Sequence, residues 1–256
     1  FTPDVIHCHD WHTAMLPYLL NHERSGFFEQ TKTVFTIHNA AFQGVHSLEK
    51  IPFLRHHPHI FSQVHGGYIN MLQTGIECAS KVTTVSPNYA DELLTDLGSH
   101  GLHERLVKRK ADLSGILNGC DYSQWNPATD AYLPENYSVD NLQPKRVCKT
   151  TLQTRSGLPE NAGVPLIGMV CRLTEQKGFG YILPILDDLV QHNLQIVIVG
   201  TGDPKVCMDL GEFAQQHPTQ FAFINGFSSE HAHLVEAGAD FFLMPSQFEP
   251  CGLNQM

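Results

Sequence analysis

The sequence predicts an α/β protein of two units, each built around a parallel β-sheet. Short apolar or β-branched runs alternate with helical segments along all 256 residues, which is the pattern of βαβ units. Polar residues gather directly after several of these runs, as in His38-Asn39 after the run 33–37. Between 122 and 137 the composition changes to Pro, Asn, Asp and Tyr without periodicity, which indicates a segment that crosses between the units.

The first half contains four expected strands, which are 4–9, 33–37, 81–85 and 114–117. The helices expected between them are 13–22, 69–79 and 89–97. Ser86-Pro87 supplies an N-cap followed by a proline at the first helical position. The stretch 52–67 is rich in His, Pro and Phe and has no clear period, so we expect a long loop or an excursion of short helices.

A helix over 144–156 leads into the second set of strands. These are 166–170, 195–199, 221–224 and 241–244, with helices between them. The expected division is therefore 1–119 for the first unit, 120–159 for a linker and crossing segment, and 160–256 for the second unit.

Composition excludes several classes of protein. Hydrophobic content of 42% with 16% charged residues is typical of a globular protein. The formal charge of −10 leaves no basic excess for a nucleic-acid surface. The local exception is 105–110, Arg-Leu-Val-Lys-Arg-Lys, which we interpret as the solvated face of a helix rather than an anion site.

The cysteines and the apolar runs indicate the compartment. Seven scattered cysteines without a Cys-x-x-Cys pair favour a reduced, cytoplasmic protein. No apolar run approaches the ~20 residues that span a bilayer, and no signal peptide is seen, so we expect a soluble protein without a membrane partner. Because the chain opens at Phe1 and enters a strand almost at once, we expect a piece of a longer protein.

Two cations follow the strand 166–170. Arg172 comes directly after this run, and a helix is expected just beyond Lys177. In doubly wound sheets ligands bind outside the carboxyl ends of the strands, and a helix N-terminus adds N–H groups that favour anions. One charge ~4 Å from a phosphate oxygen contributes roughly 4 kcal/mol at an effective dielectric of 20. The pattern favours a diphosphate ligand; the alternative is that both residues solvate a surface loop.

Two other groups of residues have competing interpretations. Gly200-Thr201-Gly202-Asp203 resembles a dinucleotide fingerprint, but Lys205 stands where the third glycine belongs, which disfavours a nicotinamide oxidoreductase. A tight turn fits better, and its amides could reach a nucleotide phosphate. The histidines at 7, 9, 12 and 38 lack the spacing of a metal site, so we expect no metal and hydrogen-bonded polar groups at strand ends.

Carboxylates occur at the ends of strands in both halves. Glu249 follows the strand 241–244, at the edge where Arg172 is expected, and Asp10 follows the first strand. A carboxylate beside cations stays ionised and accepts hydrogen bonds from a polyol. The alternative is a loop salt bridge for each. Cys251 fits a packed thiol better than a reactive one.

Six motifs together closely resemble bacterial glycogen synthases and plant starch synthases, and they occur in the family's order along the whole chain. The motifs are His9-Asp10-Trp11-His12, Thr36-Ile37-His38-Asn39-Ala40-Ala41-Phe42-Gln43-Gly44, Val85-Ser86-Pro87-Asn88-Tyr89-Ala90, Leu117-Asn118-Gly119, Arg172-Leu173-Thr174-Glu175-Gln176-Lys177-Gly178 and Glu249-Pro250-Cys251-Gly252-Leu253. Several motifs at matching intervals are far more specific than one.

The resemblance implies two Rossmann-like, doubly wound domains that face a cleft, which is the GT-B glycosyltransferase fold. It implies retaining transfer of glucose from ADP-glucose to the non-reducing end of an α-1,4-glucan, such as glycogen or a maltooligosaccharide, without a metal or a cofactor. The preference for ADP over UDP, the acceptor length and the oligomeric state stay open.

The resemblance also implies roles for single residues. Arg172 and Lys177 match the pair that holds the diphosphate, Glu249 the acid beside the donor glucose, and His38 the histidine under the reacting sugar, whose backbone carbonyl assists a front-side attack. Phe227 stands where the family often has a tyrosine against the adenine, and its ring can still stack. The further donor- and cleft-binding positions are Asp10, Asn39, Asn118, Gly119, Phe227, Cys251, Gly252 and Leu253.

The family pattern extends beyond both ends of this chain. Relatives begin with a strand and a Lys-x-Gly-Gly loop, and they continue through a Thr-Gly-Gly segment that contacts phosphate. We therefore expect a truncated fold and little activity from the 256 residues alone. A catalytically inert glucan- or nucleotide-binding fragment is the competing hypothesis. Met256 stands where broader relatives carry a second glutamate, which favours the glucan synthases over sucrose- or lipid-type enzymes.

Overall fold

The chain divides into two compact units with one parallel sheet each. The computed structural model describes residues 1–22, 26–55, 57 and 59–256. The first unit comprises 1–119 together with 249–256, and the second comprises 120–248. This division differs from the expected one in two places, because the contacts of 249–256 group it with the first unit and the segment 120–159 belongs to the second.

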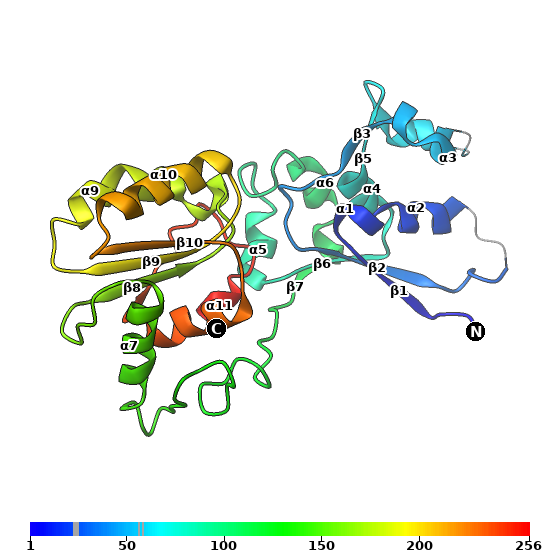
Figure 1. Cartoon of the computed structure of the whole chain (residues 1–256). Helices are drawn as coiled ribbons and strands as arrows, with labels where there is room; N and C mark the ends of the chain where they lie inside the picture. Colours follow the sequence, from blue (N-terminus) through cyan, green and yellow to red (C-terminus); the bar gives the residue numbers. More distant parts are fainter. Residues whose placement is uncertain (23–25, 56, 58) are drawn as a thin grey trace. The chain divides into compact units, whose positions relative to one another are not determined.

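The first unit has a four-stranded sheet in the order β1-β2-β6-β7, with all neighbours parallel (Figure 1). Its strands are β1 (Val5–His9), β2 (Lys32–Ile37), β6 (Lys81–Thr84) and β7 (Leu113–Gly115). Its helices are α1 (Asp10–Thr13), α2 (Met15–His22), α4 (Met71–Cys78), α5 (Pro87–Glu92) and α6 (His103–Lys108). The predicted strands are confirmed to within two residues at each end.

Side-chain alternation gives this sheet one apolar and one polar face. Cys8, Phe35 and Val82 stand opposite one another in register and are at most 1% exposed. They belong to the single buried core of the unit. The next positions along the strands, His9, Thr36 and Thr83, lie on the other face, because successive side chains of a strand alternate.

The stretch after β2 contains a small antiparallel sheet that the sequence did not predict. Its strands, in the order β3-β5-β4, are β3 (Val45–Ser47), β5 (Tyr68–Asn70) and β4 (Val64–His65). The short helices α3 (Pro52–Arg55), η1 (Leu48–Lys50) and η2 (Ile60–Gln63) lie between β3 and β4. Strands of two or three residues are too short to show a period of two, so only the short helices were foreseen.

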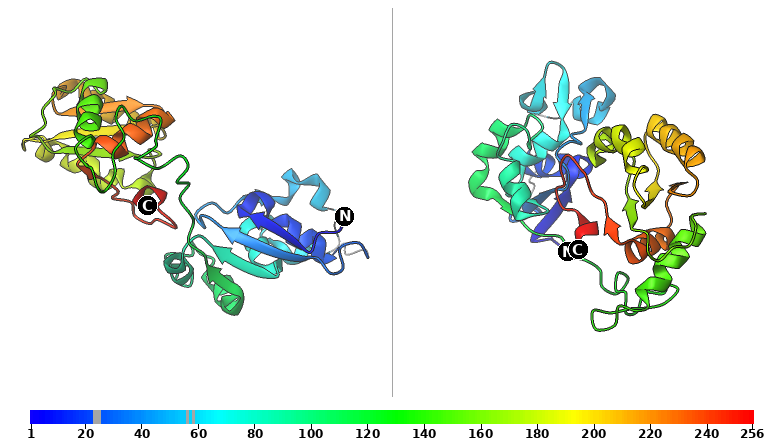
Figure 2. Two further views of the ribbon diagram at one scale, coloured as in Figure 1. Left: turned by 90° about the horizontal axis from the view of Figure 1, so that it is seen from below. Right: turned by 90° about the vertical axis from the view of Figure 1, so that its left-hand side faces the viewer.

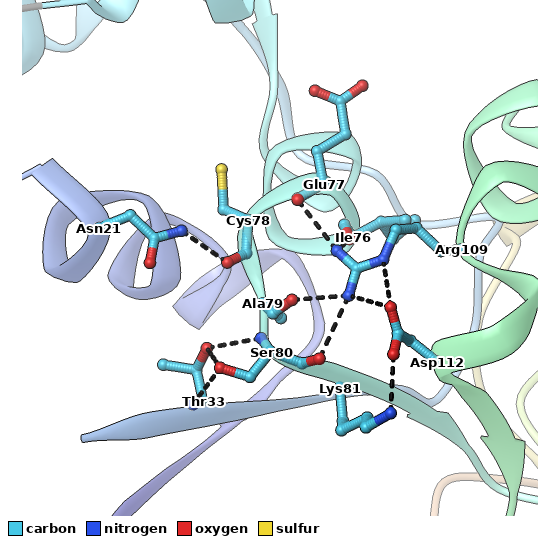
Figure 3. A network of polar contacts seen from close by, with 10 residues as sticks. All are labelled: Asn21, Thr33, Ile76, Glu77, Cys78, Ala79, Ser80, Lys81, Arg109 and Asp112. Atoms are coloured by element: carbon cyan, nitrogen blue, oxygen red, sulfur yellow. Dashed lines mark hydrogen bonds and ion pairs between the residues drawn. The ribbon is translucent and has the colours of Figure 1, made fainter. Parts of the chain in front are cut away.

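The sequence-based interpretation of Arg109 as part of a solvated helix face is wrong. Its guanidinium donates to four carbonyls at the end of α4 (Figure 3), those of Ile76 at 2.9 Å, Glu77 at 3.0 Å, Ala79 at 2.7 Å and Ser80 at 3.4 Å. It also pairs with Asp112, which in turn binds Lys81 at 2.7 Å. A helix C-terminus leaves carbonyls unpaired, and Arg109, which lies between α6 and η3, satisfies them.

The second unit has a four-stranded parallel sheet in the order β10-β9-β8-β11. The strands are β8 (Leu166–Val170), β9 (Gln195–Gly200), β10 (Phe221–Asn225) and β11 (Phe241–Phe242). The helical segments are α7 (Lys145–Arg155), η4 (Glu175–Lys177), α8 (Phe179–Ile182), η5 (Leu183–Ile185), α9 (Leu186–Leu189), α10 (Pro204–Gln216) and α11 (Ser229–Gly238).

Helices cover both faces of this sheet. In the right-hand view of Figure 2, α7 and α11 lie on one side of the strands and α10 on the other. Two separate cores result, one containing Cys148 and Val235 and the other Phe179 and Leu210. All six residues of β9 are buried, as expected for a central parallel strand covered on both faces.

The crossing segment is fastened to the second unit by a buried polar cluster. Nδ1 of His233 on α11 lies 2.6 Å from a carboxylate oxygen of Asp130, and both side chains are almost fully buried. The ring of Trp125 stacks on His233, with centroids 3.6 Å apart. A buried charge is tolerated when it is paired in this way, so 120–137 packs as part of the second unit.

Across the residues that the structure describes, we find no helix with the length and apolar character needed to cross a membrane.

Candidate active site

The ends of β1 and β2 bring Asp10 and His38 into contact. Asp10 opens α1 directly after β1 and has a φ of +52°, a conformation that costs a residue with a Cβ about 1–3 kcal/mol. Its carboxylate accepts the backbone N–H of His38 at 2.8 Å. Strain of this kind persists where the surroundings hold it, and here it places a carboxylate against the residue after β2.

The histidines of this region are hydrogen-bonded to one another and to threonines. Nδ1 of His9 lies 3.0 Å from Nε2 of His38, and Nε2 of His7 lies 2.6 Å from the hydroxyl of Thr36. The pKa of His9 is lowered, first by burial and then by the neighbouring imidazoles of His7 and His38, against the opposing effect of Asp10. Among the residues that can be described, no group of three or more His, Cys, Asp or Glu is arranged to hold a metal.

Buried hydrogen bonds fix the loop that follows His38. The hydroxyl of Tyr89 accepts the N–H of Ala40 at 3.0 Å, and burial raises the pKa of this tyrosine to about 12. The side chain of Gln43 donates to the carbonyl of Ala40 at 3.2 Å. Asn39 accepts the N–H of Ala41 at 3.0 Å. The backbone at 38–40 is therefore held in one conformation.

Gly44 closes this loop against Trp11. It has a φ of +62°, and a Cβ at this position would lie 2.4 Å from the Trp11 ring. Only glycine fits such a close approach in the left-handed region. The tryptophan of the first motif thereby packs against the end of the second motif.

The motif 249–253 packs on the first unit. The hydroxyl of Ser86 donates to the carbonyl of Pro250 at 2.7 Å while it accepts the N–H of Tyr89 at the start of α5. Cys251 is half-buried against the core of the first unit. Glu249 is half-buried, Gly252 is buried and Leu253 is exposed.

Asn118 and Gly119 follow β7. The N–H of Asn118 donates to the carbonyl of Val85 at 3.3 Å, so the chain after β7 continues alongside the end of β6. Asn118 is half-buried and Gly119 is exposed. Together with Asp10 and His38, Asn118 therefore stands at the carboxyl edge of the first sheet, where ligands bind in parallel sheets.

In the second unit, the segment that carries Arg172 runs beside the end of β9. The N–H of Cys171 donates to the carbonyl of Val199 at 3.2 Å, and the N–H of Leu173 donates to the carbonyl of Thr201 at 2.9 Å. The side chain of Arg172 lies between these two anchored positions and is exposed. An exposed guanidinium at the carboxyl edge of the sheet suits an anionic ligand.

Gly200 and Gly202 permit this close contact. A Cβ on Gly200 would lie 2.1 Å from the carbonyl oxygen of Cys171, and one on Gly202 would lie 2.3 Å from that of Leu173. The expected tight turn is thus a close approach of two backbones. The amides of the following helix are used internally, because Asp203 accepts the N–H groups of Lys205 and Val206.

Lys177 ends η4, and its loop is fastened to the segment after β11. Gly178 has a φ of +84°, and a Cβ there would lie 2.1 Å from the carbonyl oxygen of Pro245. The N–H of Gln247 donates to the carbonyl of Gln176 at 2.9 Å, and the side chain of Gln176 donates to the carbonyl of Phe248 at 3.1 Å. The helix expected beyond Lys177 is present but has only four residues.

Phe227 follows β10 and is 71% exposed. The next residue, Ser228, caps α11 by accepting the N–H of His231 at 3.1 Å. An exposed ring held between a strand and a capped helix can stack on a flat ligand.

The structure thus brings Asp10 and His38 together in the first unit and carries Arg172 and Lys177 on one anchored loop of the second. Sequence reasoning gave no positioning role to Ser86 or Gly200 and did not foresee that His9 bonds to His38. The sequence signal for this histidine cluster was that His7 and His9 lie two positions apart on one expected strand, so their side chains share a face. Nothing local marks the partners of Ser86 and Gly200.

Comparisons with known proteins agree on one family. Residues 1–108 match the family model described as starch synthase catalytic domain. The chain is 53% identical over 261 residues to a glycogen synthase of Aeromonas salmonicida, covering all of this chain and 53% of that protein. A glycogen synthase of Vibrio cholerae is 53% identical over 262 residues, covering 99% of this chain and 54% of its own length.

A solved structure of a starch synthase has a similar fold. The catalytic domain of starch synthase IV from Arabidopsis thaliana, bound to ADP and acarbose, matches 99% of this chain and 54% of its own with a TM-score of 0.89 at 32% identity. The predicted α/β fold with parallel sheets, of GT-B type, is confirmed. The chain spans about half the length of the relatives it matches, and over its whole length it is similar to bacterial glycogen synthases and to a plant starch synthase.

Proposed function

We propose that the protein carrying this chain is a retaining glycosyltransferase that moves glucose from ADP-glucose to the non-reducing end of an α-1,4-glucan in glycogen synthesis. The observation that carries the proposal is the 53% identity to glycogen synthases across the whole chain. The starch synthase structure that matches the fold binds ADP and acarbose, which supports a nucleotide-sugar donor and a glucan acceptor such as glycogen or a maltooligosaccharide.

In this reaction the glucose–phosphate bond ionises while negative charge grows on the departing diphosphate. Fixed donors aimed at that charge are the effective catalytic groups. Arg172 and Lys177 supply two cations on a loop whose backbone is hydrogen-bonded on both sides. In this proposal they take the charge-neutralising role that a metal ion has in other enzymes, so the reaction uses no metal and no cofactor.

The remaining residues orient the sugar and the base. Glu249 accepts hydrogen bonds from hydroxyls of the donor glucose, and the backbone carbonyl of His38 lies beside the reacting carbon. Asp10, which accepts the N–H of His38 at 2.8 Å, keeps that peptide unit in place. The exposed ring of Phe227 stacks on the adenine.

The cleft positions Asn39, Asn118, Gly119, Cys251, Gly252 and Leu253 complete the proposed set.

The seven cysteines form no disulfide in the described chain, which supports a reducing compartment and therefore the cytoplasm.

Replacement of the two cations tests the proposal. In the intact protein, Lys177→Ala is expected to lower kcat for glucosyl transfer ~100- to 1000-fold, because one donor to the growing charge is removed, while glucan affinity changes little. Arg172→Lys is expected not to restore the loss seen in Arg172→Ala, since an ammonium cannot hold two phosphate oxygens as a guanidinium fork does. Turnover with ADP-glucose and UDP-glucose is measured beside glucan binding.

The wild-type protein is expected to prefer ADP-glucose and to give α-linked product. If the protein transferred glucose from neither ADP-glucose nor UDP-glucose, the proposed function would be refuted. Equal losses of turnover and glucan affinity in Lys177→Ala would instead refute the role assigned to that lysine.

A further inference from the structure

The imidazole of His9 lies against that of His38 in the first unit. Nδ1 of His9 and Nε2 of His38 are 3.0 Å apart, and the ring centroids are 5.2 Å apart. At this distance one nitrogen carries the hydrogen and the other accepts it. We propose that His9 is a positioning residue for His38, which holds that ring in one orientation and one tautomer during glucosyl transfer. The inference rests on the proposed function, in which His38 lies under the reacting sugar.

His9 is itself held firmly enough to serve this role. The hydroxyl of Thr13 accepts the N–H of His9 at 2.6 Å and donates to its carbonyl at 2.8 Å. The ring of His7 lies on the same strand face, 4.2 Å from the His9 ring, and is bound to Thr36 at 2.6 Å. The His9 ring is therefore fixed through its backbone and through a neighbouring ring.

The two neighbours from the end of β1 act on different parts of His38. Asp10 accepts the backbone N–H of His38 at 2.8 Å, which fixes the peptide unit. His9 contacts the side chain, which fixes the ring. Loss of His9 therefore leaves the backbone of His38 held and releases the imidazole to other rotamers and tautomers. That separation makes the effect of His9 measurable apart from folding.

Acid is expected to break the contact. When both rings are protonated, each of the two facing nitrogens carries a hydrogen, and neither accepts. The titratable groups around the His9 ring are His7, His38 and Asp10, and burial with the two imidazoles lowers the pKa of His9 below its ordinary 6.5. The contact should therefore persist at neutral pH and weaken in acid.

Steady-state kinetics of the intact protein from pH 5 to 8 test the inference. His9→Ala is expected to lower kcat about 10-fold, the order of one net hydrogen bond, with KM for ADP-glucose changed less than about twofold and with the acid limb of kcat lost. His9→Asn places an amide near the position of Nδ1 and is expected to recover most of kcat. His103→Ala removes another histidine of this unit, one that pairs with Asp96, and serves as the matched control with unchanged kinetics.

A readout without substrate complements the kinetics. Nitrogen chemical shifts of the His38 ring in the isotope-labelled protein should report one tautomer in wild type and an average of two in His9→Ala. Unchanged kcat in His9→Ala, an equal loss in His9→Asn, or an unchanged His38 tautomer would each overturn the inference. Wild-type transfer with a normal His9→Ala variant refutes only this role of His9, whereas absence of wild-type transfer refutes the proposed function.

Discussion

Replacing Gly200 by alanine tests whether the end of β9 sets the position of Arg172. The new Cβ would lie 2.1 Å from the carbonyl oxygen of Cys171, and ordinary contact begins at 3.4 Å. The backbone before Arg172 must therefore move by about 1.3 Å, the difference between these two distances. A displacement of about 1 Å in a positioned catalytic group lowers the rate on the order of 100-fold. Crowding of a packed site also destabilises by roughly 1–3 kcal/mol.

Gly211 provides the matched control in the same unit. It lies within α10, and a Cβ there would meet nothing within 4 Å, so Gly211→Ala is expected to stabilise the protein by about 0.5–1 kcal/mol through helix propensity. Both variants, made in the intact protein, are compared by urea unfolding and by the proposed glucosyl transfer from ADP-glucose. Near wild-type kcat in a folded Gly200→Ala protein would show that contact between 171–173 and β9 does not position Arg172.

Two further predictions concern stability. Arg109→Ala should destabilise the first unit by roughly 2–4 kcal/mol, because the carbonyls at the end of α4 lose charge-assisted hydrogen bonds. Urea unfolding measures this loss, with Lys108→Ala as the control. A decrease of less than about 0.5 kcal/mol in the free energy of unfolding would contradict the capping role. Burial, and then the charge of Asp130, raise the pKa of Glu236 from 4.5 to about 7. Its protonated form thus stabilises the fold fully below pH 4.5, and the contribution is lost as the pH rises through about 7, by roughly 1–2 kcal/mol after solvent screening. Glu236→Gln should remove that decline in unfolding measurements from pH 4 to 8, and an unchanged pH profile would refute the assignment.

The strands were predictable because each is a short apolar or β-branched run that ends in polar residues. In β9 the run Gln195–Gly200 is buried throughout, so continuous hydrophobicity marked it. Caps were equally local, as Ser86 before Pro87 shows. The small sheet at 45–70 escaped prediction because its pairing, such as Val45 with Asn70, is set by contacts distant in sequence and its strands are very short.

Arg109 shows a second limit of local patterns. Its neighbours in Arg-Leu-Val-Lys-Arg-Lys made it one of several cations on a helix, yet α6 ends at Lys108 and Arg109 turns back to the carbonyls of α4. A helix end and a cation about 30 residues away carry no shared sequence signal. The same holds for Asp130 and His233, which are 103 residues apart.

For the candidate site too, the sequence indicates the functional residues but not the contacts that hold them. Asp10, His38 and Arg172 became candidates because parallel topology places residues that follow a strand at the ligand-binding edge, and the family resemblance suggested their roles. What holds them lies far along the chain. Ser86 and Pro250 are separated by 164 residues, and the loop of Lys177 is fastened by Pro245 and its neighbours. The residue types at the strand ends can therefore be read from the local sequence. The precise positions that catalysis requires depend on backbone contacts, such as those of Gly200 and Gly178, that only the folded chain reveals.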